Sequence, residues 1–258
     1  MSHLLYASNY QIYDKDYWDI DGEIFYPLDC DQNQLHICQV GFPKETPLSL
    51  QIPNEPLFAV QTSAQRTLQS RRYPEMKAVV NTNENLVKFF ETYPTSMINE
   101  DFGTRWAMYA NTPLSKLAKS SLYSSLKNTV AGKTQAEAVN RLLNFVQTAF
   151  VYEYDDKVWG GDRAFFADET LYYPYCDCED RSILFSRLVR DLLGLQVVLI
   201  YYPGHLATAV QFTENVTGDY IVMNGKRYVI CDPTYIGAPV GATMPKMDNA
   251  KAKIILLE

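Results

Sequence analysis

A single change of periodicity constrains the fold of this chain more than any other feature. From Cys178 to Leu193 the apolar residues recur at helical spacing, and Gly194 stands where a helix commonly ends. After Gly194 the pattern becomes that of successive strands with short connections: Gln196–Tyr202, Leu206–Phe212, Asp219–Met223, Arg227–Cys231 and Ala252–Leu257. One helix followed by a strand meander predicts an α+β fold in which the helix packs on an antiparallel sheet.

The first half of the chain has a different texture. Up to about residue 60, three segments alternate or run apolar between Pro, Asp and Asn, which predicts extended structure: Glu23–Tyr26, Gln34–Val40 and Leu48–Ile52. From Asn83 the pattern is helical, with Leu86, Val87, Phe89 and Phe90 in one apolar cluster. We expect residues 1–125 to form an accessory region, β-rich and then helical, and residues 126–258 to form the main domain.

Helix starts and breaks mark the middle of the chain. Thr112 followed by Pro113 predicts an N-cap with proline at the first helical position. The segment 130–133 is the best candidate linker, and Thr134 with Glu137 fits a capping box that begins the next helix. A loop rich in Asp, Gly and aromatic residues is expected from Tyr152 to Tyr175.

Composition excludes some partners. Hydrophobic residues at 47% and charged residues at 21% are typical of a soluble globular protein. The net charge of −7 disfavours a nucleic-acid partner, which requires clustered Lys and Arg. No apolar run is long enough to span a bilayer, and residues 1–13 lack a signal-peptide pattern. We therefore expect a cytoplasmic protein, or a cell-envelope protein if the chain is a processed or cloned fragment.

The five cysteines do not form a disulfide framework. Their number is odd and their spacing does not repeat: Cys30, Cys38, Cys176, Cys178 and Cys231. Cys176 and Cys178 are too close in sequence for an easy mutual bond. We expect free thiols, one of which has a chemical role.

Three short motifs in the second half combine into a possible reactive centre. Cys178 begins the expected helix, His205 follows Gly204 at the mouth of a strand, and Asp232 precedes Pro and Thr at the end of another strand. A thiol at a helix N-terminus faces unpaired backbone N–H groups, which favour a thiolate and can hold an oxyanion. A histidine within reach transfers the proton, and a carboxylate fixes its tautomer.

The scarcity of histidine sharpens this assignment. The chain contains only His3, His36 and His205. His3 lies at the terminus, and His36 lies in an expected strand without a nearby nucleophile. His205 is thus the one candidate base in the half of the chain that contains Cys178.

Taken together, the motifs resemble the transglutaminase-like superfamily of papain-type folds. Cys178–Asp180, with Ser182, Leu184, Arg190 and Gly194, is similar to the nucleophile helix of that family; Gly204–His205 and Asp232–Thr234 are similar to its histidine and aspartate motifs. The resemblance covers roughly residues 134–234. It implies a papain-like catalytic domain within residues 126–258 and a Cys178–His205–Asp232 triad that acts without a cofactor or metal.

The same resemblance implies a reaction class. Thiol attack on a peptide or other amide carbonyl, through a thioacyl intermediate, is the expected chemistry, with hydrolysis preferred. Protein-glutamine transamidation is the alternative reaction, and a catalytically silent binding or scaffold module of the same fold is the alternative class. The sequence departs from the family at Tyr175–Asp177, where glycine is common, and at Tyr228–Val229, near a common Trp.

Three other roles stay open for residues near these motifs. Cys176 could be the nucleophile, although the family register fits Cys178. Cys176, Cys178, Cys231 and His205 could in principle form a zinc site, but the usual ligand spacing is missing. Gln147 could be a second oxyanion donor, if its helix faces the site.

Overall fold

The computed structural model describes residues 10–12, 18–20, 23–25, 52, 56–93, 96–98, 102–160 and 162–257. The first three of these ranges are short strands, β1 (Tyr10–Ile12), β2 (Trp18–Ile20) and β3 (Glu23–Phe25), and β2 pairs with β3. β3 falls within the strand expected at Glu23–Tyr26. The strand expected at Gln34–Val40, nearly all of that at Leu48–Ile52, and His3, Cys30, His36 and Cys38 lie outside the described residues.

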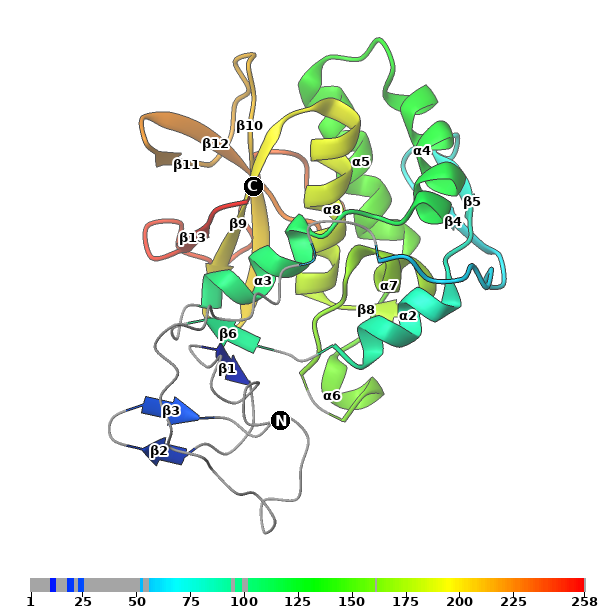
Figure 1. Cartoon of the computed structure of the whole chain (residues 1–258). Helices are drawn as coiled ribbons and strands as arrows, with labels where there is room; N and C mark the ends of the chain where they lie inside the picture. The colour runs from blue at the N-terminus through cyan, green and yellow to red at the C-terminus, as the bar shows by residue number, and fades with distance from the viewer. Residues whose placement is uncertain are drawn as a thin grey trace.

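The strands expected after Gly194 form one five-stranded antiparallel sheet. Its order is β11 (Tyr220–Met223), β12 (Lys226–Cys231), β10 (His205–Gln211), β9 (Gln196–Tyr202) and β13 (Lys253–Ile255). Figure 1 shows these strands together on one side of the molecule. The predicted strands are confirmed to within one or two residues at each end.

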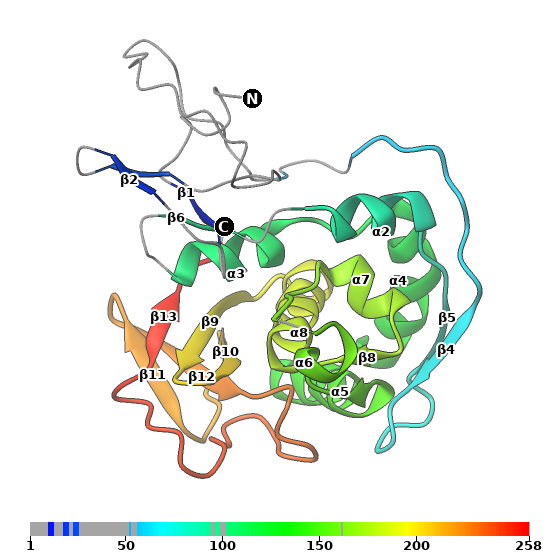
Figure 2. The ribbon, with the colours of Figure 1, turned by 90° about the horizontal axis from the view of Figure 1, so that it is seen from below.

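Helix α8 (Cys178–Leu193) packs on this sheet, against β9 and β10. Gly194 ends the helix in the left-handed conformation with φ of 65°, as expected for a glycine cap. The helix is buried along most of its length because α3, α5 and α7 cover its other faces (Figure 2). The mixed α+β class and the helix-on-sheet arrangement are therefore as predicted.

The helix starts expected from the sequence in this region are confirmed except at one place. Asn83 caps α2 (Glu84–Glu91) and Thr134 caps α5 (Gln135–Ala149), both through side-chain oxygens. The prediction that Thr112 caps a helix with Pro113 at its first position is wrong. Thr112 instead closes α3 (Phe102–Asn111) by donating from its N–H and its hydroxyl to the Met108 carbonyl.

The N-cap of the following helix is Ser115. Its hydroxyl accepts from the Ala118 N–H at the start of α4 (Lys116–Val130). The carboxylate of Asp168 holds the same residue, accepting from both the N–H and the hydroxyl of Ser115. This long-range anchor fixes the helix start three residues later than local sequence indicates.

The loop expected between Tyr152 and Tyr175 contains local structure. It includes the short helices α6 (Asp155–Val158) and α7 (Ala167–Tyr172), and β7 (Val151–Tyr152) pairs in parallel with β8 (Tyr175–Cys176). The segment carries Phe165 and Phe166, both fully buried. Burial of these rings gives the segment a fixed path to the start of α8.

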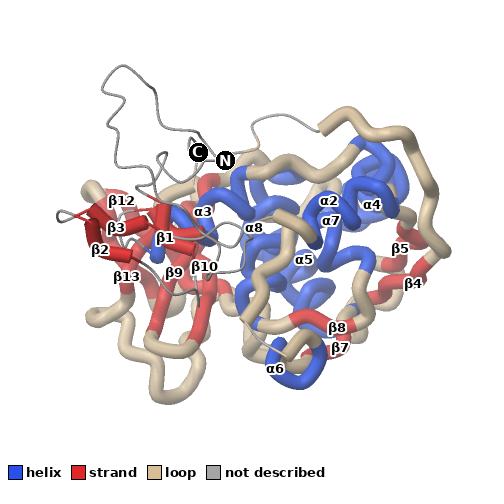
Figure 3. Tube along the Cα trace, turned by 60° about the horizontal axis from the view of Figure 1, so that its bottom comes forward, coloured by secondary structure: helices blue, strands red, loops and turns tan. Residues whose placement is uncertain are grey.

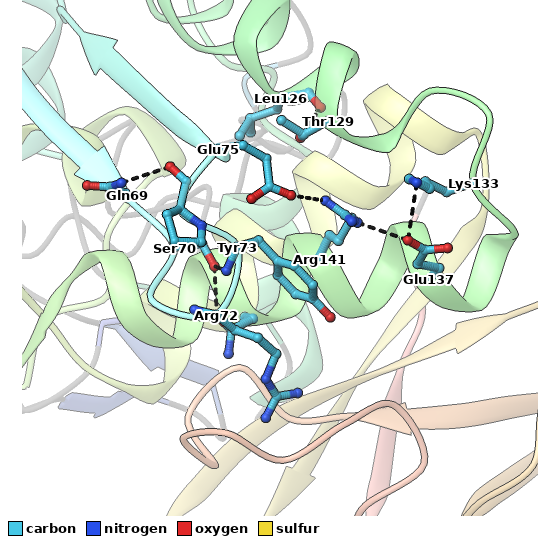
Figure 4. A network of polar contacts seen from close by, with 12 residues as sticks. Gln69, Ser70, Arg72, Tyr73, Glu75, Leu126, Thr129, Lys133, Glu137 and Arg141 are labelled. Atoms are coloured by element: carbon cyan, nitrogen blue, oxygen red, sulfur yellow. Dashed lines mark hydrogen bonds and ion pairs between the residues drawn. The ribbon is translucent and has the colours of Figure 1, made fainter.

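The hairpin of β4 (Arg66–Gln69) and β5 (Lys77–Val80) joins the helices through polar contacts. Its turn places Glu75 2.6 Å from the Arg141 guanidinium, which also contacts Glu137 on the preceding turn of α5 (Figure 4). Nearby, the Ser70 hydroxyl donates to the buried Asn144 side chain. These contacts attach the hairpin to α5.

The five-stranded sheet lies on one side of the molecule and most of the helices lie on the other, as Figure 3 shows, and one core joins them. The expected boundary between residues 125 and 126 falls inside α4, and Leu68 and Leu122 share a core with Leu142 and Ile183. β6 (Ser96–Ile98) pairs with β1. No helix in the described ranges has the length and apolarity that crossing a membrane requires.

Candidate active site

The clearest element of the site is the pair formed by His205 and Asp232. The Nε2 atom of His205 lies 2.8 Å from Oδ2 of Asp232, and both side chains are buried. His205 opens β10 directly after the turn at Pro203–Gly204, where Gly204 has φ of 77°, a conformation that suits glycine. Asp232 follows the last residue of β12, the strand beside β10. Strand pairing therefore brings these two predicted residues together.

The second carboxylate oxygen of Asp232 is held by the backbone. Oδ1 accepts from the N–H groups of Thr234 and Tyr235, at 2.8 and 3.1 Å. Asp and Asn commonly make such contacts in turns. The orientation of this carboxylate is thus fixed independently of His205.

Gln147 holds the backbone that follows Asp232. Its side-chain N–H groups donate to the carbonyls of Asp232, Tyr235 and Ala238, and its Oε1 accepts from the Gly237 N–H. The side chain is buried and fully engaged in these contacts. Gln147 is therefore a clamp on the segment 232–238, and the idea that it donates to an oxyanion is wrong for this arrangement.

Cys178 lies at the first position of α8 and is 9% exposed. Its side chain and that of His205 line one pocket of about 250 Å³. The helix is attached beside the histidine by Ser182, whose hydroxyl donates to the Leu206 carbonyl at 2.9 Å. Cys178 and His205 thus face one pocket from two elements that are bound to each other.

The thiol of Cys178 donates to Oε2 of Glu179, at 3.0 Å. Among the described residues it makes no hydrogen bond to His205. Burial, with the charges of Glu179 and Asp177, raises the pKa of the Cys178 thiol well above its ordinary value, and the Leu206 backbone offsets this only in part. The resting site therefore keeps the proton on sulfur, although the helix N-terminus alone would favour a thiolate.

Acidic side chains surround the start of α8. Asp180 is fully buried and accepts from the N–H group of Asp177, directly before the helix, and from that of Phe165. Asp155 accepts from the Arg163 N–H at 2.6 Å, and burial raises its pKa to about 7. Burial and the neighbouring carboxylates also raise the pKa of Asp177.

The other described cysteines lie away from the pocket lining. Cys176 is buried, accepts from the Arg181 guanidinium at 3.4 Å, and has a pKa raised to about 12 by burial. Cys231 is completely buried within β12. In the described part of the chain, the ligand atoms of Cys176, Cys178, Cys231 and His205 do not come together as a candidate metal site.

Four pocket residues could not be found from sequence motifs. Trp106 on α3 and Tyr201 on β9 stack with ring centroids 5.2 Å apart, and Tyr152 and Tyr154 meet edge to face at 5.4 Å. The aromatic content of the segment 152–175 hinted at the tyrosine pair. Nothing local marked Trp106, which reaches the pocket only through the packing of α3 against α8.

Comparison with known proteins assigns no family to this chain. No protein-family model matches the sequence, and no match was found among curated proteins.

Proposed function

We propose that this chain is a cysteine-dependent acyl-transfer enzyme of the transglutaminase-like, papain-type class, and that it hydrolyses a peptide or other amide bond. The observation that carries the proposal is the hydrogen bond between His205 and Asp232 beside a pocket that Cys178 also lines. A nucleophile helix on an antiparallel sheet that supplies the histidine and the aspartate is the arrangement that the resemblance implies.

The first half-reaction uses the proton of the Cys178 thiol. An ionised Asp232 accepts from Nε2–H of His205, so Nδ1 is the ring atom that receives the thiol proton. The thiolate then attacks the carbonyl carbon, and first-turn N–H groups of α8 stabilise the oxyanion. When the C–N bond breaks, His205 returns the proton to the departing amine and a thioester remains on Cys178.

Hydrolysis completes the cycle. Water gives a proton to His205 as its oxygen attacks the thioester carbonyl, the C–S bond breaks, and the sulfur recovers the proton. The products are a carboxylic acid, an amine and the regenerated thiol. Asp232 keeps its charge throughout and stabilises the imidazolium that forms twice in each turnover.

Iodoacetamide labelling followed by peptide mapping tests the nucleophile directly. We expect Cys178 to be modified well ahead of Cys176 and Cys231, because only Cys178 among these three lines the pocket. Cys178→Ala should remove the fast labelling, and Cys176→Ala, a matched change two residues away on β8, should leave it. Equal labelling of the three cysteines in the folded protein would refute the proposal and favour a silent scaffold.

A further inference from the structure

The pocket beside Cys178 is acidic. Its lining includes the carboxylates of Asp162, Asp177 and Glu179, whereas His205 is the only basic residue that lines it among the residues described. An amide carbonyl has no need of this charge, and the charge opposes the thiolate that the reaction requires. The acidic lining therefore calls for an occupant of opposite charge.

The neighbouring cations are engaged elsewhere. The Arg163 guanidinium pairs with the buried Glu169 and lies over the Trp159 ring, and Lys157 pairs with Glu153 at 2.8 Å. In the described ranges, neither Asp177 nor Glu179 has an ion pair with a lysine or arginine. Within this part of the chain, Asp177 and Glu179 thus have no lysine or arginine as a counter-ion.

Asp177 supplies an independent sign of a missing partner. Its side chain is 7% exposed and lines the pocket, and its Oδ1 atom has no hydrogen-bond partner among the described residues. A buried carboxylate oxygen without a donor is unfavourable by itself. A ligand that carries N–H donors and positive charge satisfies it.

The remaining walls suit the same ligand. Trp106 and Tyr201 form one aromatic pair, and Tyr152 and Tyr154 form another, within the lining that includes the carboxylates. Aromatic faces attract ammonium groups, and desolvation in a pocket strengthens that attraction. Carboxylates and aromatic rings together recognise a cationic amine in preference to a neutral or anionic group.

We propose that this pocket binds an ammonium group of the substrate, held by Glu179 and Asp177 against the aromatic walls. The inference rests on the proposed function, because it names the substrate class of the Cys178 site. The ammonium belongs either to the acyl donor, on a side chain or an N-terminus near the reacting carbonyl, or to an amine that accepts the acyl group.

Binding of the ammonium also bears on the nucleophile. Oε2 of Glu179 accepts a hydrogen bond from the Cys178 thiol, at 3.0 Å. An ammonium bound between Glu179 and Asp177 places a positive charge beside the sulfur, which favours the thiolate, so it lowers the pKa of the Cys178 thiol. Glu179 and Asp177 thereby couple binding of the substrate ammonium to activation of the Cys178 thiol.

Three electrophiles with the same iodomethyl carbonyl group and different charge test the preference: N-(2-aminoethyl)iodoacetamide, iodoacetamide and iodoacetate. Second-order rate constants for labelling of Cys178 at low salt should fall in that order, with the cation at least about tenfold faster than the neutral reagent. Glutathione treated in parallel corrects for intrinsic reactivity. Glu179→Gln should reduce the cation-to-neutral ratio about tenfold and speed labelling by neutral iodoacetamide.

Glu75→Gln is the matched control, because it makes the same change in a carboxylate that pairs with Arg141 outside the pocket lining (Figure 4). It should leave all three rate constants unchanged. A second measurement identifies the source of the ammonium. Acyl-enzyme formed from p-nitrophenyl acetate and treated with 1,4-diaminobutane gives acetylated diamine if the amine is the acceptor, and acetate alone if the charge belongs to the donor.

The outcomes separate the two proposals. Fast labelling of Cys178 without a charge preference, or with an unchanged ratio in Glu179→Gln, would overturn the ammonium site and leave the nucleophile intact. Loss of labelling on chelation, restored by a divalent cation, would assign the carboxylates to a metal and likewise overturn it. If Cys178 is not labelled faster than Cys176 and Cys231, the proposed function itself is wrong.

Discussion

Replacement of Asp232 by Asn exchanges one carboxylate oxygen for an amide NH2 group and removes the negative charge, and it should leave the rest of the segment in place. Oδ1 accepts from the N–H groups of Thr234 and Tyr235, so the amide oxygen of asparagine must occupy that position. The amide nitrogen then takes the place of Oδ2, 2.8 Å from Nε2 of His205. Because that nitrogen donates, it favours the tautomer with the proton on Nδ1, which cannot accept the thiol proton.

The size of the effect follows from the contact that is lost. A hydrogen bond to a charged partner contributes about 1.5–3 kcal/mol, which corresponds to a reduction of roughly 10- to 150-fold in formation of the thiolate–imidazolium pair. Stability should change little, because both backbone N–H groups keep an acceptor. Asp232→Ala should by contrast also destabilise the fold, by about 2 kcal/mol, since those two N–H groups then lose their partner.

The assay is the rate of Cys178 alkylation by iodoacetamide from pH 5 to pH 9, with urea unfolding of the same samples. Wild type should show a labelling phase near neutral pH that Asp232→Asn lacks, while the two unfold at similar urea concentrations. If Asp232→Asn retains the wild-type rate within about threefold, less than 1 kcal/mol, the carboxylate has no part in activating the thiol.

Two further changes test the support of the site. Gln147→Ala should destabilise the protein by about 2–4 kcal/mol in urea unfolding and slow labelling of Cys178, because it removes the buried side chain that holds the segment after Asp232. Gln135→Ala removes an exposed contact and should have little effect. Equal destabilisation by both changes would contradict the clamp. Burial raises the pKa of Asp155 to about 7, so the folded state keeps a proton that the unfolded state loses near pH 4, and stability falls as pH rises through this range. From pH 5 to pH 8, the free energy of unfolding should fall by about 1–2 kcal/mol more in wild type than in Asp155→Asn. If urea unfolding gives the same pH dependence for both proteins, this prediction is wrong.

Local signals sufficed for the helix and strands that carry the site. The limits of α8 follow from a cysteine in an acidic first turn and from Gly194, both of which act within a few residues. The register of β9 and β10 follows from apolar runs on either side of Pro203–Gly204. These elements could be predicted because the residues that determine their limits are close to one another in the sequence.

The features that the sequence did not reveal depend on distant contacts. Ser115 rather than Thr112 begins α4 because Asp168, 53 residues away, anchors it. Gln147 bonds to a segment 85 to 91 residues away, and its helix alone gives no sign of that partner. The pairing of the thiol with Glu179 is local in sequence, yet its effect on the thiol requires burial that only the folded chain provides.

Detection of a covalent intermediate tests the central claim most directly. The protein is mixed with p-nitrophenyl acetate, quenched in acid within seconds, and analysed by intact-protein mass spectrometry and peptide mapping. A nucleophilic Cys178 predicts one transient acetyl group on that residue, absent in Cys178→Ala and present in Cys176→Ala. An acetyl group that forms equally fast in Cys178→Ala, or that maps to another residue, would contradict the account.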